Sequence, residues 1–309
     1  MHLSSPLESA SSFNLTQWSH QQRALVEAAL SDWVAAPARH PAPAGLGDAM
    51  RYAVLDGGKR LRPLLVMAAC RAVNGDPQAA VRAACAVELI HAYSLVHDDM
   101  PCMDNDVLRR GKPTVHVQFG EAAALLAGDA LQALAFELLT PDDVSVAADV
   151  QARLCRMLAQ AAGCHGMAGG QAIDLASVGK PLTSEQLHQM HRLKTGALLQ
   201  ASVLMGAACG QATAAAQSAL ADYGATIGLA FQVVDDVLDV TADSALLGKT
   251  AGKDAAQHKP TFVSLLGLDA SKAYAAQLLE RSRASLAASG LAQTDALGAL
   301  ADMLVNREH

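Results

Sequence analysis

Apolar residues along most of this chain recur three and four positions apart, which is the spacing of one face of an α-helix. Near the beginning, Trp18, Leu25 and Trp33 fit this spacing and predict an amphipathic helix that ends before a proline-containing loop. Asp76 followed by Pro77 is a typical N-cap and first-turn pair, and it predicts a helix that runs to about residue 99. The same spacing predicts further helices around residues 119–139, 146–162, 184–208, 213–240, 270–288 and 294–305.

The pattern leaves little room for strands or for a boundary between domains. No segment alternates polar and apolar residues over a strand's length, and no repeat of fixed period is present in the sequence. Thr183 and Gln186 have the spacing of a capping box, which strengthens the helix predicted to start at 184. We therefore predict one all-α domain over residues 1–309, in which residues 1–45 form an N-terminal helix and a loop.

Composition supports a helical protein of the cytoplasm. Of the 309 residues, 51% are hydrophobic but only 4% are aromatic, which rules out disorder and disfavours a β-rich fold. The formal charge of -7 has the wrong sign for a general nucleic-acid binder. The six cysteines form no C-x-x-C pair, and the polar first twenty residues do not resemble a signal peptide. Polar residues interrupt the uncharged stretch 195–221, so it predicts buried helices instead of a membrane span.

Two clusters of aspartates, each at the end of an apolar predicted helix, are the main candidates for chemistry. The clusters comprise Asp98, Asp99 and Asp104 in the first, and Asp235, Asp236 and Asp239 in the second. In the second cluster the carboxylates and Gln232 fall on one face of a helix, and like charges so close together need a cation. A single cluster is equally well read as a solvated acidic helix end. Two clusters together favour a metal site, and carboxylate oxygens without histidine or cysteine favour magnesium.

Magnesium held by few carboxylates takes further oxygens from phosphates, so the sequence implies a phosphorylated substrate. Two short basic segments supply the opposite charge: residues 57–62 (GGKRLR) and residues 109–112 (RRGK). We expect Lys59 and Arg62 to share one helix face, Arg60 to be structural, and Gly57 and Gly58 to let the backbone approach an anion closely.

Several longer motifs resemble those of the bacterial short-chain prenyl diphosphate synthases. These motifs cover roughly residues 45–305 and read GGKRLRP (57–63), HAYSLVHDDMPCMDND (91–106), LRRGKPT (108–114), GGQAIDL (169–175), HRLKTGAL (191–198) and GLAFQVVDDVLD (228–239). The resemblance implies an α-helical bundle of the isoprenoid-synthase type around a deep central cavity, usually as a homodimer. It also implies a reaction that joins isopentenyl diphosphate to an allylic diphosphate.

The resemblance further implies the role of each site residue. Three magnesium ions would bind the allylic diphosphate. They would be held by Asp98, Asp99, Asp104 and Asp235, with Asp236 and Asp239 in support. Residues assisting the ionising group would be Arg109, Lys194 and Lys259, with Thr195, Gln232 and Lys249 bordering the carbocation or its leaving group. Residues holding isopentenyl diphosphate would be Gly58, Lys59, Arg62, His91 and Arg110. Ser94 and Tyr93 would line the substrate site, and an aromatic residue at 93 resembles a floor that stops chain growth at fifteen carbons.

Other interpretations remain open at this point. Tyr93 can be ordinary core packing, His91 can bond Glu88 within its helix, and His97 can serve only to orient a carboxylate. Asp106 and Asp254 are placed outside the metal shell. Within prenyl chemistry the alternatives are synthases of twenty-carbon products and terpene cyclases. A di-iron carboxylate protein is a remote alternative, based on the E-x-x-H pairs at residues 88–91 and 185–188 with Glu121 and Glu137, and a non-catalytic helical scaffold is a third.

Overall fold

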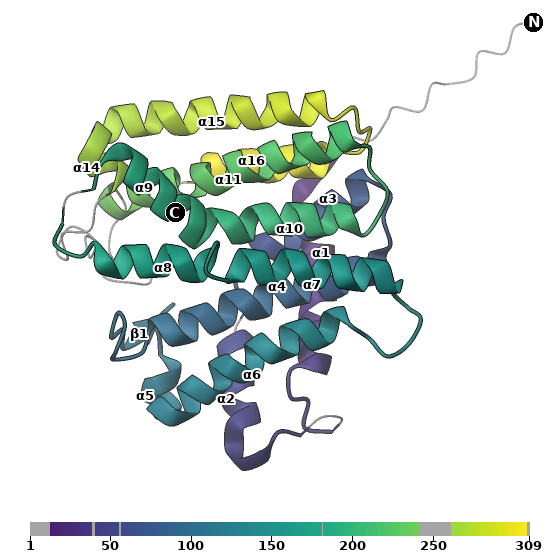
Figure 1. Cartoon of the computed structure of the whole chain (residues 1–309), viewed down its shortest axis with the longest axis vertical. Coiled ribbons are helices and arrows are strands. Elements are labelled where there is room, and N and C mark those ends of the chain that lie inside the picture. The colour runs from purple at the N-terminus through teal and green to yellow at the C-terminus, as the bar shows by residue number, and fades with distance from the viewer. Residues whose placement is uncertain (1–12, 39–40, 56, 181, 242–260, 308–309) are drawn as a thin grey trace, which may run out of the picture.

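The computed structural model describes residues 13–38, 41–55, 57–180, 182–241 and 261–307. These residues are helical apart from loops and one two-stranded hairpin, as Figure 1 shows, so the expected all-α class is confirmed. The first half contains α1 (Leu15–Trp33), a 3₁₀ turn (Pro43–Gly45), α2 (Leu46–Val54), α3 (Leu61–Ala72), α4 (Pro77–Asp98), β1 (Leu108–Arg109), β2 (Lys112–Pro113), α5 (Val115–Phe119) and α6 (Glu121–Leu139). The second half contains α7 (Ala148–Ala162), α8 (Met167–Ala176), α9 (Ser184–His191), a π-helical stretch (Arg192–Gly196), α10 (Ala197–Ala208), α11 (Ala214–Thr241), α14 (Phe262–Leu266), α15 (Leu268–Ala288) and α16 (Asp295–Val305).

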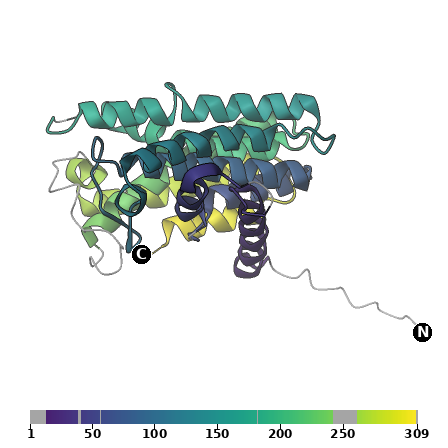
Figure 2. The ribbon, with the colours of Figure 1, turned by 90° about the horizontal axis from the view of Figure 1, so that it is seen from below.

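The long helices lie side by side and form a bundle. Packed neighbours follow one another in the order α6, α4, α3, α10, α11 and α15. Figure 2 shows α1, in dark purple, crossing these helices, while α7 and α8 lie on the opposite side of the bundle. The two helices that carry the aspartate clusters, α4 and α11, therefore both belong to the interior of the bundle.

Local sequence signals explain where several helices begin. The Asp76 side chain accepts a hydrogen bond from the Gln78 amide at 2.8 Å, with Pro77 in the first turn of α4. At α9, the Thr183 hydroxyl accepts from the Gln186 amide and the Gln186 side chain accepts from the Thr183 amide, at 3.2 and 3.0 Å. Both predicted caps are confirmed, because the relevant side chains satisfy amides that have no partner inside the helix.

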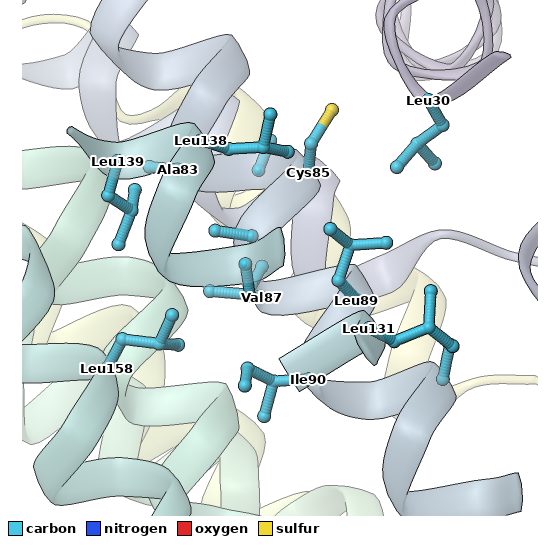
Figure 3. Packing of buried hydrophobic residues seen from close by; sticks show 14 of the residues in the cluster. Leu30, Ala83, Cys85, Val87, Leu89, Ile90, Leu131, Leu138, Leu139 and Leu158 are labelled. Carbon is cyan, nitrogen blue, oxygen red and sulfur yellow. The ribbon is translucent and has the colours of Figure 1, made fainter. Parts of the chain in front are cut away.

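The core explains the strongly apolar sequence of α4. Leu89 and Ile90 are fully buried against Leu131 of α6 and against α7 and α1, and Figure 3 shows these side chains converging. A second apolar cluster fills the space between α3, α10, α11, α15 and α16. Among the residues that the structure describes, two helices could cross a membrane by length and composition, α4 and α6, with 67% and 39% of their most apolar windows buried in the bundle. Core packing accounts for the hydropathy of α4, while much of α6 presents apolar side chains at the surface.

The elements that the sequence did not predict are α2, α3, α5, α8, α14 and the β1–β2 hairpin. The helix predicted over 119–139 is preceded by the short α5, from which Gly120 separates it with φ +88°. Residues 184–208 are continuous helix as predicted, but with a π-helical stretch in the middle.

Candidate active site

The first aspartate cluster lies where α4 ends. Asp98 is the last residue of α4 and Asp99 is its C-cap. The following loop folds back, because the Asp104 amide donates to the Asp98 carbonyl at 2.9 Å and Asn105 adopts a left-handed conformation with φ 51°. The loop therefore returns Asp104 to the end of the helix beside Asp98, as the metal hypothesis requires.

Electrostatics at this helix end are unfavourable for carboxylates in the absence of a cation. The C-terminus of a helix carries partial negative charge, so acidic residues there are destabilising. Burial, together with the neighbouring charges of Asp104 and Asp99, raises the pKa of Asp98 to about 6, although Lys194 and Arg109 oppose the shift. Burial also raises the pKa of Asp99, even though the Arg109 guanidinium donates to it at 2.5 to 2.9 Å. A divalent cation would reduce the repulsion between these carboxylates.

The hairpin after the first cluster directs its two arginines to different places. Arg110 and Gly111 form its two-residue turn, both with positive φ. Arg109 reaches back to Asp99, whereas Arg110 donates to the Gly57 carbonyl at 3.2 Å. A Cβ at Gly58 would lie 2.9 Å from Nη1 of Arg110, so the glycine permits this close approach.

The basic segment at 57–62 differs in one respect from the sequence prediction. Arg60 is the N-cap of α3 in a left-handed conformation, so Lys59 precedes the helix and does not share a helix face with Arg62. The prediction that Arg60 is structural agrees with the geometry: its guanidinium donates to Glu27, Glu88 and the Val54 carbonyl at 2.6 to 2.7 Å. The buried Arg60 ion pairs fix the backbone between Lys59 and Arg62.

A cavity of about 880 Å³ joins this basic segment to the second aspartate cluster. Its wall includes five of the predicted substrate-binding residues and two of the second-cluster aspartates: Gly58, Lys59, Arg62, His91, Arg110, Asp235 and Asp239. Burial is the main cause that lowers the pKa of His91 well below its ordinary value, with four nearby arginines acting in the same direction. His91 is therefore a neutral hydrogen-bonding group in a strongly basic wall.

A smaller space of about 100 Å³ lies between the hairpin and α4. It is lined by Asp99, Arg109 and Arg110, together with Tyr52 and Leu95 among others. Arg110 thus borders both spaces and connects the first cluster to the larger cavity.

Within the second cluster, the three carboxylates have different surroundings. Asp235 is ion-paired with Arg307, from the C-terminal end of the chain, and Asp239 lines the cavity. Asp236 is buried, and its oxygens accept hydrogen bonds from the Gln232 side chain at 2.8 Å and from the Phe262 amide at 2.7 Å. Asp236 therefore anchors the start of α14 to α11, and its place among the metal ligands stays a prediction.

Lys194 and Thr195 lie in the π-helical stretch, a departure from α-helix that is frequent at functional sites. The Lys194 ammonium pairs with Asp174 of α8 at 2.5 Å and also acts electrostatically on Asp98. The Thr195 hydroxyl donates to the Gln232 side chain at 3.3 Å. These contacts link the π-helical stretch to both aspartate clusters.

The remaining residues on α4 lie near the first cluster. Tyr93 is partly buried and its ring meets the His97 ring edge-on, with centroids 5.7 Å apart. His97 lies within hydrogen-bonding distance of the Leu125 carbonyl of α6, at 3.0 Å, so its imidazole contacts α6 and not the carboxylate of Asp98. The Ser94 hydroxyl donates to the His91 carbonyl at 2.8 Å within its own helix. Substrate contact by Ser94 and Tyr93 stays a prediction.

Sequence reasoning overlooked some residues of this site, and others lie beyond the described chain. Lys249 and Lys259, predicted to act on the allylic side, lie outside the described residues, as does Asp254. Arg307 was overlooked because no local pattern distinguishes the C-terminal tail. Asp174 belongs to a quoted motif, but only the folded chain reveals its pairing with Lys194.

The donor set suits magnesium better than iron. Within the described ranges, no group of three acidic, histidine or cysteine side chains is arranged to hold a metal ion by itself. Magnesium fits such an arrangement, because it keeps waters and takes one or two carboxylates together with phosphate oxygens. The di-iron alternative is disfavoured because the Glu88 carboxylate is engaged by Arg60 at 2.6 Å and Glu185 lies exposed in the first turn of α9.

Comparisons with known proteins agree with this geometry. Residues 43–292 match the family described as Polyprenyl synthetase. Farnesyl diphosphate synthase of Geobacillus stearothermophilus is 43% identical over 96% of this chain and 99% of its own length. Geranylgeranyl pyrophosphate synthase 4 of Arabidopsis thaliana is 47% identical over 86% of this chain and 72% of its own. A solved geranyltransferase of Helicobacter pylori, complexed with magnesium and isoprenyl diphosphate, superposes with a TM-score of 0.83 at 34% identity, covering 97% of this chain and all of that one.

Proposed function

Because the chain belongs to the polyprenyl synthetase family, we propose that it is a magnesium-dependent trans-prenyltransferase with farnesyl diphosphate synthase activity. It condenses isopentenyl diphosphate first with dimethylallyl diphosphate and then with geranyl diphosphate. The observation that carries this proposal is the cavity of about 880 Å³, whose wall contains both the cations of Lys59, Arg62 and Arg110 and the carboxylates of Asp235 and Asp239. The basic side chains can bind one diphosphate directly. The aspartates can bind a second diphosphate through metal ions.

Each condensation breaks one bond and forms another. The carbon–oxygen bond of the allylic diphosphate breaks, and the electron pair leaves with the diphosphate. The double bond of isopentenyl diphosphate attacks the resulting allylic cation and forms the new carbon–carbon bond. A proton is then lost to the departing diphosphate, which restores a double bond. The products are the lengthened allylic diphosphate and inorganic diphosphate.

On the allylic side, the residues present fit magnesium ions that would bind together with a diphosphate. Asp98, Asp99, Asp104 and Asp235 would hold them, and we propose three ions per site. Magnesium, when bound, supplies positive charge that stabilises the leaving diphosphate. The cations of Lys194 and Arg109 lie beside the first cluster and can bind the same leaving group. Thr195, Gln232, Lys249 and Lys259 are proposed to complete this side.

On the other side, basic side chains and the space beside Gly58 accommodate isopentenyl diphosphate. Lys59, Arg62 and Arg110 neutralise the diphosphate, and neutral His91 adds a hydrogen bond without adding charge. Because glycine has no side chain, Gly58 leaves space for the guanidinium of Arg110. Apolar helices around both sites exclude water, which protects the allylic cation from hydrolysis.

We further propose that the protein acts as a homodimer in the cytosol. The outer side of α6 exposes Leu125 and Leu126, which are 46% and 55% exposed, beside Val117 of α5 at 50%. An apolar helix face of this kind is suited to burial against a second copy of the chain. All six cysteines are free thiols, which suits a reducing compartment.

The proposal is tested by following diphosphate release from purified protein. Release should require magnesium, isopentenyl diphosphate and an allylic diphosphate together, because ionisation is productive only when the second substrate captures the cation. An excess of chelator should abolish it. Release from an allylic diphosphate alone at the same rate would identify a hydrolase and overturn the proposal.

A further inference from the structure

Arg307 follows α16 and reaches into the cavity of the candidate active site. Its side chain is only 14% exposed, and its guanidinium pairs with the Asp235 carboxylate. The same guanidinium lies over the Phe231 ring, 4.5 Å from the centroid, and donates to the Phe231 carbonyl at 3.3 Å. The end of the chain is thereby attached to the last part of α11, beside the second aspartate cluster.

The surroundings of Arg307 indicate that the carboxylate holds it in place. Lys59, Arg62 and Arg110 line the same cavity and repel another cation. Nε of Arg307 is buried with no hydrogen-bond partner among the described residues. A buried donor without a partner is destabilising, so the contacts to Asp235 and Phe231 offset both this loss and the repulsion.

A metal ion at Asp235 competes with this arrangement. A divalent cation and a guanidinium that bind one carboxylate repel each other, and the metal reduces the negative charge that attracts Arg307. Asp235 is 38% exposed, so a hydrated ion can approach it from the cavity while Arg307 is displaced.

We propose that Arg307 is the resident counter-cation of Asp235 in the metal-free protein, and that metal binding at Asp235 and docking of Arg307 on it exclude each other. The inference rests on the proposed function, which places metal at the second cluster. By linkage, the factor by which the docked arginine weakens metal binding equals the factor by which the metal weakens docking. The position of Arg307 therefore depends on whether a metal ion is bound at Asp235.

Displacement also gives Arg307 a second partner. The released guanidinium stays beside a cavity whose other cations suit a diphosphate, and arginine binds such groups with two parallel hydrogen bonds. Arg307 should therefore oppose metal binding when the cavity holds no diphosphate and assist diphosphate binding once metal is present.

The test measures Mn²⁺ binding by electron paramagnetic resonance of the free ion, without substrates, on the full-length chain. Arg307→Gln should bind Mn²⁺ about two- to fivefold more tightly than wild type, the range for loss of a partly exposed ion pair. The matched control is Arg283→Gln, which removes an arginine paired with Asp302 of α16 outside the cavity and should leave binding unchanged. Identical isotherms for Arg307→Gln and wild type, including no binding to either, would overturn the inference.

A second variant separates this inference from the proposed function. Asp235→Asn should weaken Mn²⁺ binding. If it does and Arg307→Gln matches wild type, only the inference is wrong; if Asp235→Asn also binds like wild type, metal at the second cluster is wrong as well. As a readout independent of affinity, hydrogen exchange in the peptide 303–307 of wild type should speed up when Mn²⁺ is added. Unchanged exchange at saturating Mn²⁺ would contradict displacement of the arginine.

Discussion

Arg60 and Arg62 lie two positions apart in one basic segment, yet we expect opposite effects when each is replaced by methionine. The Arg60 and Glu88 side chains are 3% and 7% exposed and are joined at 2.6 Å, with further bonds from Arg60 to Glu27 and to the Val54 carbonyl. Arg60→Met leaves Glu88 buried without its charge partner. The expected loss is about 3–5 kcal/mol of the free energy of unfolding, the cost of breaking a buried ion pair from one side.

The charge on Arg62 is not stabilised in this way. Desolvation is the main cause that lowers the pKa of Arg62, in spite of Glu88 and Asp235 nearby, and its Nε has no hydrogen-bond partner among the described residues. A lowered pKa for a base means that folding disfavours the charged form, so Arg62→Met should leave stability unchanged or raise it. The Michaelis constant for isopentenyl diphosphate should rise more in Arg62→Met than in Arg60→Met, because only Arg62 lines the cavity as a proposed ligand-binding cation.

Urea unfolding followed by circular dichroism, at one protein concentration and in excess chelator, measures both free energies. The double variant Arg60→Met/Glu88→Leu should regain much of the stability that Arg60→Met loses, because the buried carboxylate that lost its arginine is then absent. A loss below about 1 kcal/mol in Arg60→Met, or an equal loss in Arg62→Met, would refute the division of this segment into a structural and a ligand-binding arginine.

Four further outcomes are expected. Asp98→Ala or Asp235→Ala should lower turnover by orders of magnitude, a loss of ~3 kcal/mol or more of transition-state stabilisation, and near-normal turnover in either would contradict metal binding by both clusters. Lys59→Met should mainly raise the Michaelis constant for isopentenyl diphosphate, whereas Lys194→Met should mainly lower kcat, and indistinguishable steady-state profiles would disprove two separate diphosphate sites. Tyr93→Ala should lengthen the product beyond fifteen carbons, since residue 93 lies roughly 7.5 Å before Asp98 along α4, and an active variant that still stops at fifteen would place the floor elsewhere. In chelator, the raised pKa of Asp98 stabilises the folded protein at pH values below 3.8, the ordinary pKa of an aspartate, and this stabilisation is lost as the pH rises through about 6. Asp98→Asn should therefore flatten the dependence of the free energy of unfolding on pH between these two values.

Residues whose role is local were predictable from the sequence. The cap of Asp76 and the capping box of Thr183 depend on side chains within three positions, and both form as expected. The acidic stripe on α11 follows from helical periodicity alone. A role that depends on distant residues was predicted only from charge and resemblance: the basic segments meet the second aspartate cluster at the cavity between α3, α4, α11 and the hairpin.

The elements that were missed depend on tertiary contacts. Gly169 and Gly170 argue against a helix at 167–176, yet a Cβ at Gly170 would lie 2.1 Å from the Lys194 amide nitrogen, so packing of α8 on the π-helical stretch requires glycine. Lys59 and Arg62 were expected to share a helix face, whereas α3 begins only at Leu61, after Arg60 in a left-handed conformation. Arg307 has no sequence signal, because its partner lies 72 positions away.

The central claim, prenyl transfer that stops at fifteen carbons, is tested most directly by the chain length of the product. Purified protein would be supplied with magnesium, dimethylallyl diphosphate and isopentenyl diphosphate, and the hydrolysed products separated by chromatography. The account predicts a fifteen-carbon main product, with ten carbons as a transient intermediate. A twenty-carbon main product would contradict the floor at Tyr93, and no condensation product at all would contradict the function.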